Sequence, residues 1–359
     1  MAKMEVLLTL VFCLMLLASK VGICSTTTAK RPTSCEDKFN AFPGHSACLE
    51  PSEKFISGGV SAEDKMLIVD QHNKYRRQIK HASDMQMMVW DDELERVAEG
   101  WAKQCISDHE DGILRRIPGR FSVGQNLGID YTSWENCISG WFNESKDFRY
   151  NDSSVKFEDV GHFTQLVWSG SSLVGCAFAV CKGASGNQWK FYVCNYGPSG
   201  NVAGTLTPYN VGEKCGGCNL TCNDGLCDCG GIVCYNGGIL DLNTCSCSCF
   251  KNFHVGHQCE LDCNLAQDEW YCESHYTRSA CGTQNAPLEC PNMCSICPWS
   301  GRNYTAGSVT VPGPGSNYTE GTVTVPERPP PIINRSADHG IGSMIIIAEI
   351  ILIWQTVHG

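Results

Sequence analysis

The stretch Gly161–Trp168, which reads GHFTQLVW, is the part of the chain that decides the fold. Two cysteine-bearing segments follow it closely, Gly175–Cys181 (GCAFAVC) and Phe191–Asn201 (FYVCNYGPSGN). Both are rich in apolar, aromatic and β-branched residues, which is typical of strands. A histidine beside a glycine is followed by two predicted strands that both carry cysteines. This pattern indicates a pocket residue that is positioned by a disulfide-bonded sheet.

These three segments, in this order and spacing, resemble the two signature regions of the CAP superfamily. That family contains the cysteine-rich secretory proteins, the antigen-five allergens and the plant pathogenesis-related proteins. The resemblance implies an α+β fold, a three-layer α-β-α sandwich followed here by small disulfide-rich modules. It implies a secreted binding or signalling module rather than an enzyme. It also implies that Cys176 pairs with Cys194 and Cys105 with Cys181.

Helices are expected on either side of the signature. Ser61 and Asp64 have the spacing of a capping box at a helix start. A second helix is expected to open at Asp91, and a third near Thr132–Phe142. The apolar residues predicted to share one face of the second helix are Leu94, Val97, Ala98, Trp101 and Cys105.

The signature cysteines fall in a predicted antiparallel hairpin. Val174–Val180 and Trp189–Tyr196 are the two strands, and Gly183–Gly186 separates them with turn residues. With the helices, these strands place a first domain at residues 55–209, after an N-terminal extension at residues 25–54.

The composition indicates a secreted chain. It has 25 cysteines in 359 residues, which favours a disulfide scaffold made in an oxidising compartment. Residues 1–24 read as a signal peptide, because Lys3 precedes an apolar run from Val6 to Ala18 that is too short to span a membrane. Six asparagines lie in glycosylation sequons: Asn143, Asn151, Asn219, Asn303, Asn317 and Asn334.

The formal net charge is −11, and no long basic run appears. Nucleic acid is therefore not expected as a partner, because neutralising phosphates needs clustered Lys and Arg. The partners expected instead are extracellular proteins and, through the family resemblance, a sterol or lipid. The oligomeric state is not predicted.

Cysteine-rich modules follow the first domain. Residues 210–228 resemble the hinge of cysteine-rich secretory proteins, residues 229–260 resemble an EGF-like module, and residues 261–298 resemble the six-cysteine domain of sea-anemone potassium-channel toxins. A toxin-like Lys-Tyr pair is absent from the last segment, which disfavours channel block. Units this small need disulfides for stability, since they cannot bury enough apolar surface.

The cysteine count of the first domain is odd. Its seven cysteines are Cys35, Cys48, Cys105, Cys137, Cys176, Cys181 and Cys194. Either Cys24 survives signal cleavage as an eighth, or one thiol is free, or one thiol pairs between chains. The pairing of Cys35, Cys48 and Cys137 stays open.

The C-terminal segment predicts a stalk and an attachment signal. Residues 299–335 contain a repeated, sequon-bearing motif, NYTAGSVTVP and then NYTEGTVTVP, which is typical of an extended linker. Residues 336–359 begin with small residues and end in an apolar tail, which fits a glycosylphosphatidylinositol signal with Ser336 as the attachment residue. A secreted form without an anchor and a membrane-spanning tail are the alternatives. The protein is therefore expected outside the cell, either free or tethered.

The family resemblance also implies a central cleft in which two histidines and two acids converge on a divalent metal. By motif, three of these positions are His109, Glu144 and His162. The fourth is Gln125 in Gly124-Gln-Asn126, where the family has glutamate. Glutamine keeps one acceptor oxygen but loses the charge. We therefore expect Zn²⁺ or another divalent ion to bind weakly, with hydrogen bonding across a polar cleft as the alternative. His72, which lies in a structural helix motif of the family, is expected to be a packing residue.

No catalytic residue is predicted. Hydrolysis needs a nucleophile poised by a base or a metal-activated water, and the chain has no G-x-S-x-G string. The expected function is a non-enzymatic binding module at the cell exterior. The alternatives are a secreted metal-dependent protease or esterase, which would use the two histidines and Glu144, and a venom or immune effector released from the cell.

Overall fold

The computed structural model describes residues 35–202, 205–272, 274–276, 280–281, 286–294 and 296–297. All of them belong to one compact unit, Met1–Ser308. The expected signal peptide, stalk and attachment signal lie outside the described residues, as do Cys24, Asn303, Asn317, Asn334 and Ser336. Within the ranges that the structure describes, no helix is long and apolar enough to cross a membrane.

A mixed sheet of five strands forms the centre of the first domain. Four strands follow the order β1 (Phe55–Gly58), β4 (Leu173–Lys182), β5 (Gln188–Gly197) and β3 (Gly124–Ile129), all antiparallel to their neighbours. The fifth, β2 (Val89–Trp90), pairs in parallel with β4. The predicted hairpin is therefore confirmed as β4 and β5, and β3 lies at an edge of the sheet.

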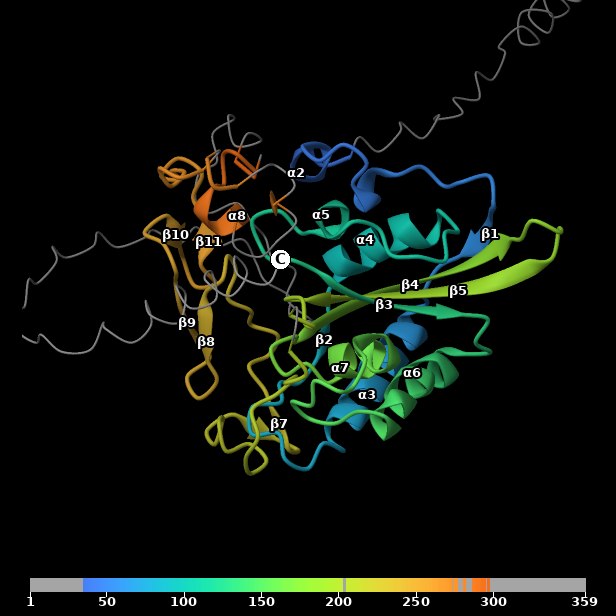
Figure 1. Cartoon of the computed structure of the whole chain (residues 1–359), viewed down its shortest axis with the longest axis horizontal. Helices are drawn as coiled ribbons and strands as arrows, with labels where there is room; N and C mark the ends of the chain where they lie inside the picture. Colours follow the sequence, from blue (N-terminus) through green and yellow to red (C-terminus); the bar gives the residue numbers. More distant parts are fainter. Residues whose placement is uncertain are drawn as a thin grey trace, which may run out of the picture. The chain divides into compact units, whose positions relative to one another are not determined.

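Helices cover both faces of this sheet (Figure 1). The helical elements of the first domain are α2 (Asp37–Asn40), η1 (Ser46–Cys48), α3 (Ala62–Arg76), α4 (Asp92–Ala102), α5 (Gly112–Arg115), α6 (Trp134–Asn143), η2 (Glu144–Lys146), η3 (Phe157–Asp159) and α7 (Gly161–Leu166). In Figure 1, α4 and α5 lie on one side of the strands, and α3, α6 and α7 lie on the other. This is the expected three-layer α-β-α sandwich.

Strand alternation divides the core between the two faces. Phe191 and Val193 of β5 pack with Ala98 and Trp101 of α4. The alternate residues of β5 pack with α3, α6 and α7 in the larger cluster, which includes Tyr192, Cys194, Tyr196, Ile68, Trp141 and Phe163. Successive strand residues point to opposite faces, so a single apolar hairpin supplies both halves of the core.

The helix starts follow the local sequence signals. Ser61 caps α3 with a complete capping box to Asp64, as predicted. Asp91 caps α4 by accepting from the backbone N–H groups of Glu93 and Leu94. The placement of Cys105 on the α4 face is wrong, because α4 ends at Ala102 and Cys105 has a positive φ of 56°. The chain turns at Cys105, and the sulfur of Cys105 forms a disulfide with Cys181.

Disulfides join the sheet to the segments around it. Cys176 pairs with Cys194 and Cys105 pairs with Cys181, the two pairs implied by the family resemblance. Cys35 pairs with Cys48, a pairing that the sequence left open. Cys137 forms no disulfide within the described residues and is fully buried in α6. Of the alternatives for the odd cysteine, the structure therefore has a buried free thiol at Cys137.

The later cysteines form eight further disulfides in three groups. The hinge has Cys215–Cys222 and Cys218–Cys227. The next six cysteines pair first to third, second to fourth and fifth to sixth, as Cys229–Cys245, Cys234–Cys247 and Cys249–Cys259. The last six pair first to sixth, second to fourth and third to fifth, as Cys263–Cys297, Cys272–Cys290 and Cys281–Cys294.

Short strand pairs accompany these disulfides, as expected where little apolar surface is buried. The pairs are β6 (Cys222–Asn223) with β7 (Leu226–Cys227), β8 (Ile239–Asp241) with β9 (Ser246–Ser248), and β10 (His254–Val255) with β11 (Glu260–Leu261). The last group also contains α8 (Ala286–Glu289). With the first domain, these groups make up an α+β sandwich followed by small disulfide-rich modules.

Candidate functional site

The four predicted site residues lie around β3, a strand at one edge of the sheet. Gln125 and Asn126 are consecutive and buried on this strand, so their side chains point to opposite faces of the sheet. Gln125 is opposite Asn195 of β5, and Asn126 is opposite Cys194. At an edge strand, side chains from both faces of the sheet can approach the same rim. We call His109, Gln125, Glu144 and His162 the two-histidine cluster.

The first half of this cluster pairs His109 with Gln125. His109 Nδ1 lies 2.7 Å from Gln125 Oε1, and Gln125 Nε2 donates to Asn195 Oδ1 at 3.0 Å. Because an amide oxygen only accepts, the Nδ1 atom of His109 carries the proton. His109 is exposed on one side, yet desolvation of the ring lowers its pKa, and the hydrogen bond to Gln125 opposes this shift.

The second half pairs His162 with Glu144. His162 is the second residue of α7, and its Nδ1 atom lies 2.6 Å from Glu144 Oε1. The other carboxylate oxygen of Glu144 accepts from the backbone N–H of Phe163 at 3.0 Å. The ring of Trp141 stacks on His162 with centroids 6.1 Å apart. Glu144, directly after α6, thus joins the end of that helix to the start of α7.

Buried polar groups connect the cluster to the core of the domain. Asn126 Nδ2 donates to the backbone oxygen of His162 at 3.0 Å and lies 3.3 Å from Tyr196 Oη. Tyr196 Oη in turn lies 3.0 Å from His72 Nε2, while His72 Nδ1 contacts the backbone oxygen of Ile68. His72 is fully buried in α3, as expected for a packing residue.

The donor set does not fit a tightly held metal ion. With both Nδ1 atoms engaged, His109 and His162 each keep one Nε2 atom as a ligand, and their hydrogen-bonded partners have the arrangement of an outer shell. Zinc sites use three or four protein ligands. Each carboxylate oxygen of Glu144 accepts one hydrogen bond and keeps a further lone pair, so the expectation that Glu144 is a third ligand stays a prediction. No group of three or more metal-binding side chains occurs among the described residues.

A buried acid that the sequence analysis missed lies beside Gln125. Glu110 is only 6% exposed, and its Oε1 atom accepts from Ser46 Oγ at 3.1 Å. Burial raises the pKa of Glu110, while Arg115 and the Gln125 amide act in the opposite direction. The loss of an acid at position 125 therefore does not leave this half of the cluster without a carboxyl group. Its position directly after His109 is the signal that could have revealed it.

A separate cavity of about 580 Å³ lies near the start of α7. We call it the loop cavity; its lining residues are Asn151, Asp152, Ser153, Val155, Phe157, Asn201, Val202, Thr205 and Leu206. Backbone pairing holds its two walls together, since Asn151 N donates to Leu206 O at 3.0 Å. Phe157 and Val202 expose 47% and 43% of their surface, so two apolar side chains face water at its rim.

The three sequon asparagines within the described residues are all exposed. Asn143 is the last residue of α6 and directly precedes Glu144. Asn151 lines the loop cavity and has a positive φ of 54°. Asn219 lies in the hinge. Attachment of glycans at these asparagines stays a prediction.

The chain is similar to known secreted proteins in sequence and in structure. The family model described as "Cysteine-rich secretory protein family" matches residues 69–196. The cysteine-rich venom protein Mr30 of Conus marmoreus is 32% identical over 280 residues, covering 74% of this chain and 91% of the relative. A protein of Trittame loki named CRISP/Allergen/PR-1 is 38% identical over 218 residues, covering 54% of this chain and 52% of the relative.

Among solved structures, that of NaASP2 with Zn²⁺ is 29% identical to this chain. The superposition covers 47% of this chain and 97% of NaASP2, with a TM-score of 0.40.

Proposed function

Since the chain belongs to the CAP family of cysteine-rich secretory proteins, we propose that it is a non-enzymatic extracellular protein whose first domain binds an apolar ligand, a sterol or lipid, in the loop cavity. The eleven disulfides of the described residues are consistent with an oxidising, extracellular location. The observation that carries the proposal is the loop cavity itself.

Its size and lining suit such a ligand. Ligand pockets commonly enclose about 300–1,000 Å³ and combine an apolar lining with a few polar groups. The loop cavity is about 580 Å³, and Val155, Phe157, Val202 and Leu206 supply apolar surface. Covering the exposed rims of Phe157 and Val202 would remove apolar area from water, which favours binding by about 25 cal/mol per Å². Asn151 and Asn201 supply polar groups to the same lining.

A sterol-binding measurement tests the proposal. Purified protein is titrated with a fluorescent sterol, and the same titration is repeated with Val202→Asp and with Met66→Asp. Met66 is 62% exposed on α3 and does not line the loop cavity, so it is a matched control for a charge placed on an exposed apolar residue. We expect Val202→Asp to weaken binding at least tenfold and Met66→Asp to leave it unchanged. Equal sterol affinity in the unchanged protein, Val202→Asp and Met66→Asp would contradict the proposal.

A weak divalent-metal site at the two-histidine cluster is a second, subordinate part of the proposed function. The observation that favours it is the pair of Nε2 atoms on His109 and His162, each on a ring oriented by an oxygen partner at Nδ1. Solvent molecules would have to complete the coordination of any ion held there. The alternative of a metal-dependent protease or esterase needs Glu144 as a ligand or base, in addition to the two hydrogen bonds that its oxygens accept.

Release from the cell or attachment to its surface separates the remaining alternatives. A venom or immune effector, in line with the names of the Conus relatives, would be released. A protein attached through Ser336 would stay on the cell surface until phosphatidylinositol-specific phospholipase is added. Loss of surface signal on treatment supports the anchored form, and accumulation in untreated medium supports the released one.

The hinge and the two six-cysteine modules are proposed to contact extracellular proteins.

A further inference from the structure

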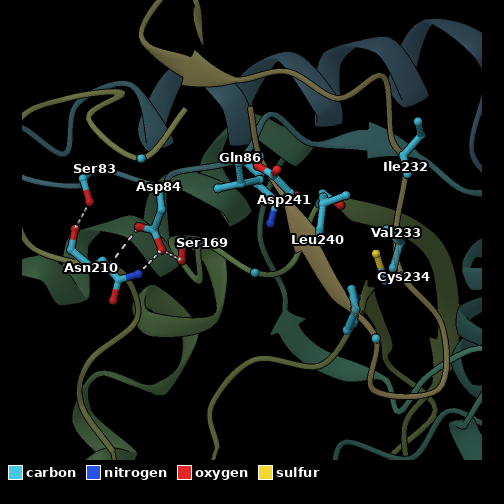
Figure 2. A pocket seen from close by; sticks show the side chains of 16 residues that line it. Ser83, Asp84, Gln86, Ser169, Asn210, Ile232, Val233, Cys234, Leu240 and Asp241 are labelled. Carbon is cyan, nitrogen blue, oxygen red and sulfur yellow. Dashed lines mark hydrogen bonds between the residues drawn. The ribbon is translucent and has the colours of Figure 1, made fainter. Parts of the chain in front are cut away.

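A second cavity, of about 480 Å³, lies where the first domain meets the hinge and the module that follows it (Figure 2). We call it the junction cavity. The first domain contributes Asp84, Gln86 and Ser172 to its wall, and the later segments contribute Ile232, Leu240 and Asp241. It shares no lining residue with the loop cavity.

Backbone hydrogen bonds hold the walls of this cavity together. Cys227 N donates to Met85 O, and Met87 N donates to Cys227 O, both at 2.8 Å. Gly217 N donates to Ser83 O at 2.8 Å. The disulfides Cys218–Cys227 and Cys234–Cys247 fix the loops that carry the opposite wall. The junction cavity is therefore preformed, and a ligand would not have to order its walls on binding.

One buried polar side chain of the cavity wall has no partner among the described residues. The hydroxyl of Ser172, a residue 2% exposed, has no hydrogen-bond partner among the described residues. Buried polar groups are ordinarily hydrogen-bonded, so this hydroxyl marks a place where a further polar atom is expected. Gln86, a residue 9% exposed, also lines the cavity, and its backbone oxygen accepts from Arg76.

The charge of the wall is negative. Its 16 lining residues include Asp84 and Asp241 but no lysine, arginine or histidine. Asp84 accepts only from neutral donors, namely Asn210 N at 2.9 Å, Asn210 Nδ2 at 2.8 Å and Ser169 Oγ at 3.0 Å. The nearby guanidinium of Arg76 interacts with Asp84 at longer range, but its donors go to backbone carbonyls.

Asp241 has no cationic partner at all among the described residues. It accepts from Asn243 N at 2.9 Å and from Thr244 Oγ1 at 2.8 Å, and it forms no salt bridge there. A carboxylate has about four lone-pair sites, so about two remain for a ligand. Its charge is therefore available to a cation that enters the cavity.

The polar and apolar parts of the wall are separated. In the view of Figure 2, Ser83, Asp84, Ser169 and Asn210 form a hydrogen-bonded group at one end, and Ile232, Val233 and Leu240 lie toward the other. Gln86 and Asp241 are drawn between them. A ligand that satisfies this wall needs a positively charged, hydrogen-bond-donating head and an apolar body.

We propose that the junction cavity binds a small organic cation, an ammonium group attached to an aromatic or branched aliphatic body. The ammonium group donates to Asp241 and to the Gln86 amide oxygen, and the body packs against Ile232 and Leu240. Asp241 is exposed to solvent, so a cation gains a charge pair there that a neutral alcohol lacks, and an anion of the same shape would meet two carboxylates. The site is independent of the proposed sterol binding.

Three probes of similar shape and different charge test this inference. Phenethylammonium, phenethyl alcohol and hydrocinnamate are each titrated into the purified full-length protein by calorimetry near neutral pH. We expect saturable binding in the order cation, alcohol, anion, with the cation about threefold tighter than the alcohol, as for an ion pair to an exposed carboxylate. Equal affinities, a preference for the anion, or no saturable binding of any probe in the millimolar range would overturn the proposal.

Two variants of lining residues and one control variant test whether the cation binds in the junction cavity. Asp241→Asn keeps the acceptor for Asn243 and is expected to weaken only the binding of the cation, about threefold, to the affinity of the alcohol. Leu240→Ala should weaken cation and alcohol by the same factor. Asp70→Asn removes an exposed carboxylate on α3 and should change neither. Near-ultraviolet circular dichroism checks folding, and unchanged cation binding by correctly folded Asp241→Asn would place the ligand elsewhere.

Discussion

His162 and Glu144 form a hydrogen-bonded pair, with Nδ1 and Oε1 2.6 Å apart, that joins the start of α7 to the end of α6. The pair sets the direction of the imidazole, because the second carboxylate oxygen is held by the backbone N–H of Phe163. His162 therefore presents its Nε2 atom away from the carboxylate. His109 does the same against an uncharged amide. The two imidazoles are matched in geometry and differ in the charge of their partner.

Restoring a carboxylate at position 125 should strengthen metal binding. An anionic partner at Nδ1 raises the basicity of a ligating histidine, and such outer partners change metal affinity about 10–100-fold. We expect Gln125→Glu to bind Zn²⁺ about tenfold more tightly than the natural chain, and His109→Ala with His162→Ala to abolish binding. Calorimetric titration of chelator-treated protein measures both. An unchanged Zn²⁺ affinity in Gln125→Glu would contradict the proposal that the partner of His109 Nδ1 sets the metal affinity.

Arg120 should be a major contributor to stability. It pairs with Asp91 and Glu93 at 2.7 Å and lies over the rings of Phe121 and Tyr235, which links the first domain to the module after the hinge. Removing one partner of a largely buried ion pair costs about 3–5 kcal/mol, so Arg120→Met should lower the free energy of unfolding by about that amount.

Arg96 supplies the control for that prediction. Its side chain is 51% exposed and pairs with Glu36, so Arg96→Met should cost less than about 1 kcal/mol. Guanidinium unfolding of the oxidised proteins gives both values. Similar losses for the two variants would show that the Arg120 network adds nothing beyond a surface pair.

Cys137 should be an unreactive thiol in the folded protein. It is fully buried, and burial raises the pKa of its thiol well above the usual range, which keeps it protonated. Iodoacetamide should label it only after denaturation, and Cys137→Ala should remove that label. Peptide mass spectrometry reads both results. Labelling of Cys137 in the native protein, or a covalent dimer through it, would contradict the structure.

A glycan at Asn151 should restrict the loop cavity. Asn151 is exposed and lines that cavity, whereas Asn219 is an exposed sequon asparagine in the hinge. In protein made in a glycosylating host, Asn151→Gln should bind a fluorescent sterol several-fold more tightly, and Asn219→Gln should bind as the unchanged chain does. Intact mass establishes occupancy. If Asn151 is occupied and its loss leaves the affinity unchanged, the ligand lies elsewhere.

Acid should destabilise the protein as the pH falls from about 6.5 toward 4. Burial lowers the pKa of His45, His72 and His254 to about 4, below the usual value of 6.5. In this window the unfolded chain binds more protons than the folded one. The free energy of unfolding therefore decreases as the pH decreases, and the contribution of these histidines to stability is complete only above pH 6.5. Urea unfolding at a series of pH values measures the slope.

Two glutamine variants test which histidines cause this pH dependence of the free energy of unfolding. His72→Gln should reduce it, because the fully buried His72 is one of the three histidines that must stay neutral. His81 is exposed, and His81→Gln should leave the slope unchanged. A pH-independent free energy of unfolding between 6.5 and 4 would show that these histidines are not held neutral by the fold.

The helix starts and the hairpin could be predicted because their signals are local. A cap at Ser61 or Asp91 needs only the next three residues, and the β4–β5 hairpin needs only alternation across a short turn. The prediction failed at Cys105, where a disulfide to Cys181, 76 residues away, overrides the helical pattern. Cys35, Cys48 and Cys137 stayed open for the same reason, since pairing depends on distances that spacing does not contain.

The sequence by itself determined the family, the disulfide-rich character and the four residues of the two-histidine cluster. Only the tertiary structure decided their hydrogen-bond partners: Glu144 orients His162, His109 pairs with Gln125, and buried Glu110 lies beside Gln125. The junction cavity, lined from Ser83 to Leu242, likewise exists only in the folded chain. The physical reason is that motifs record which side chains are present, while hydrogen-bond partners, burial and cavities depend on residues that meet from distant segments.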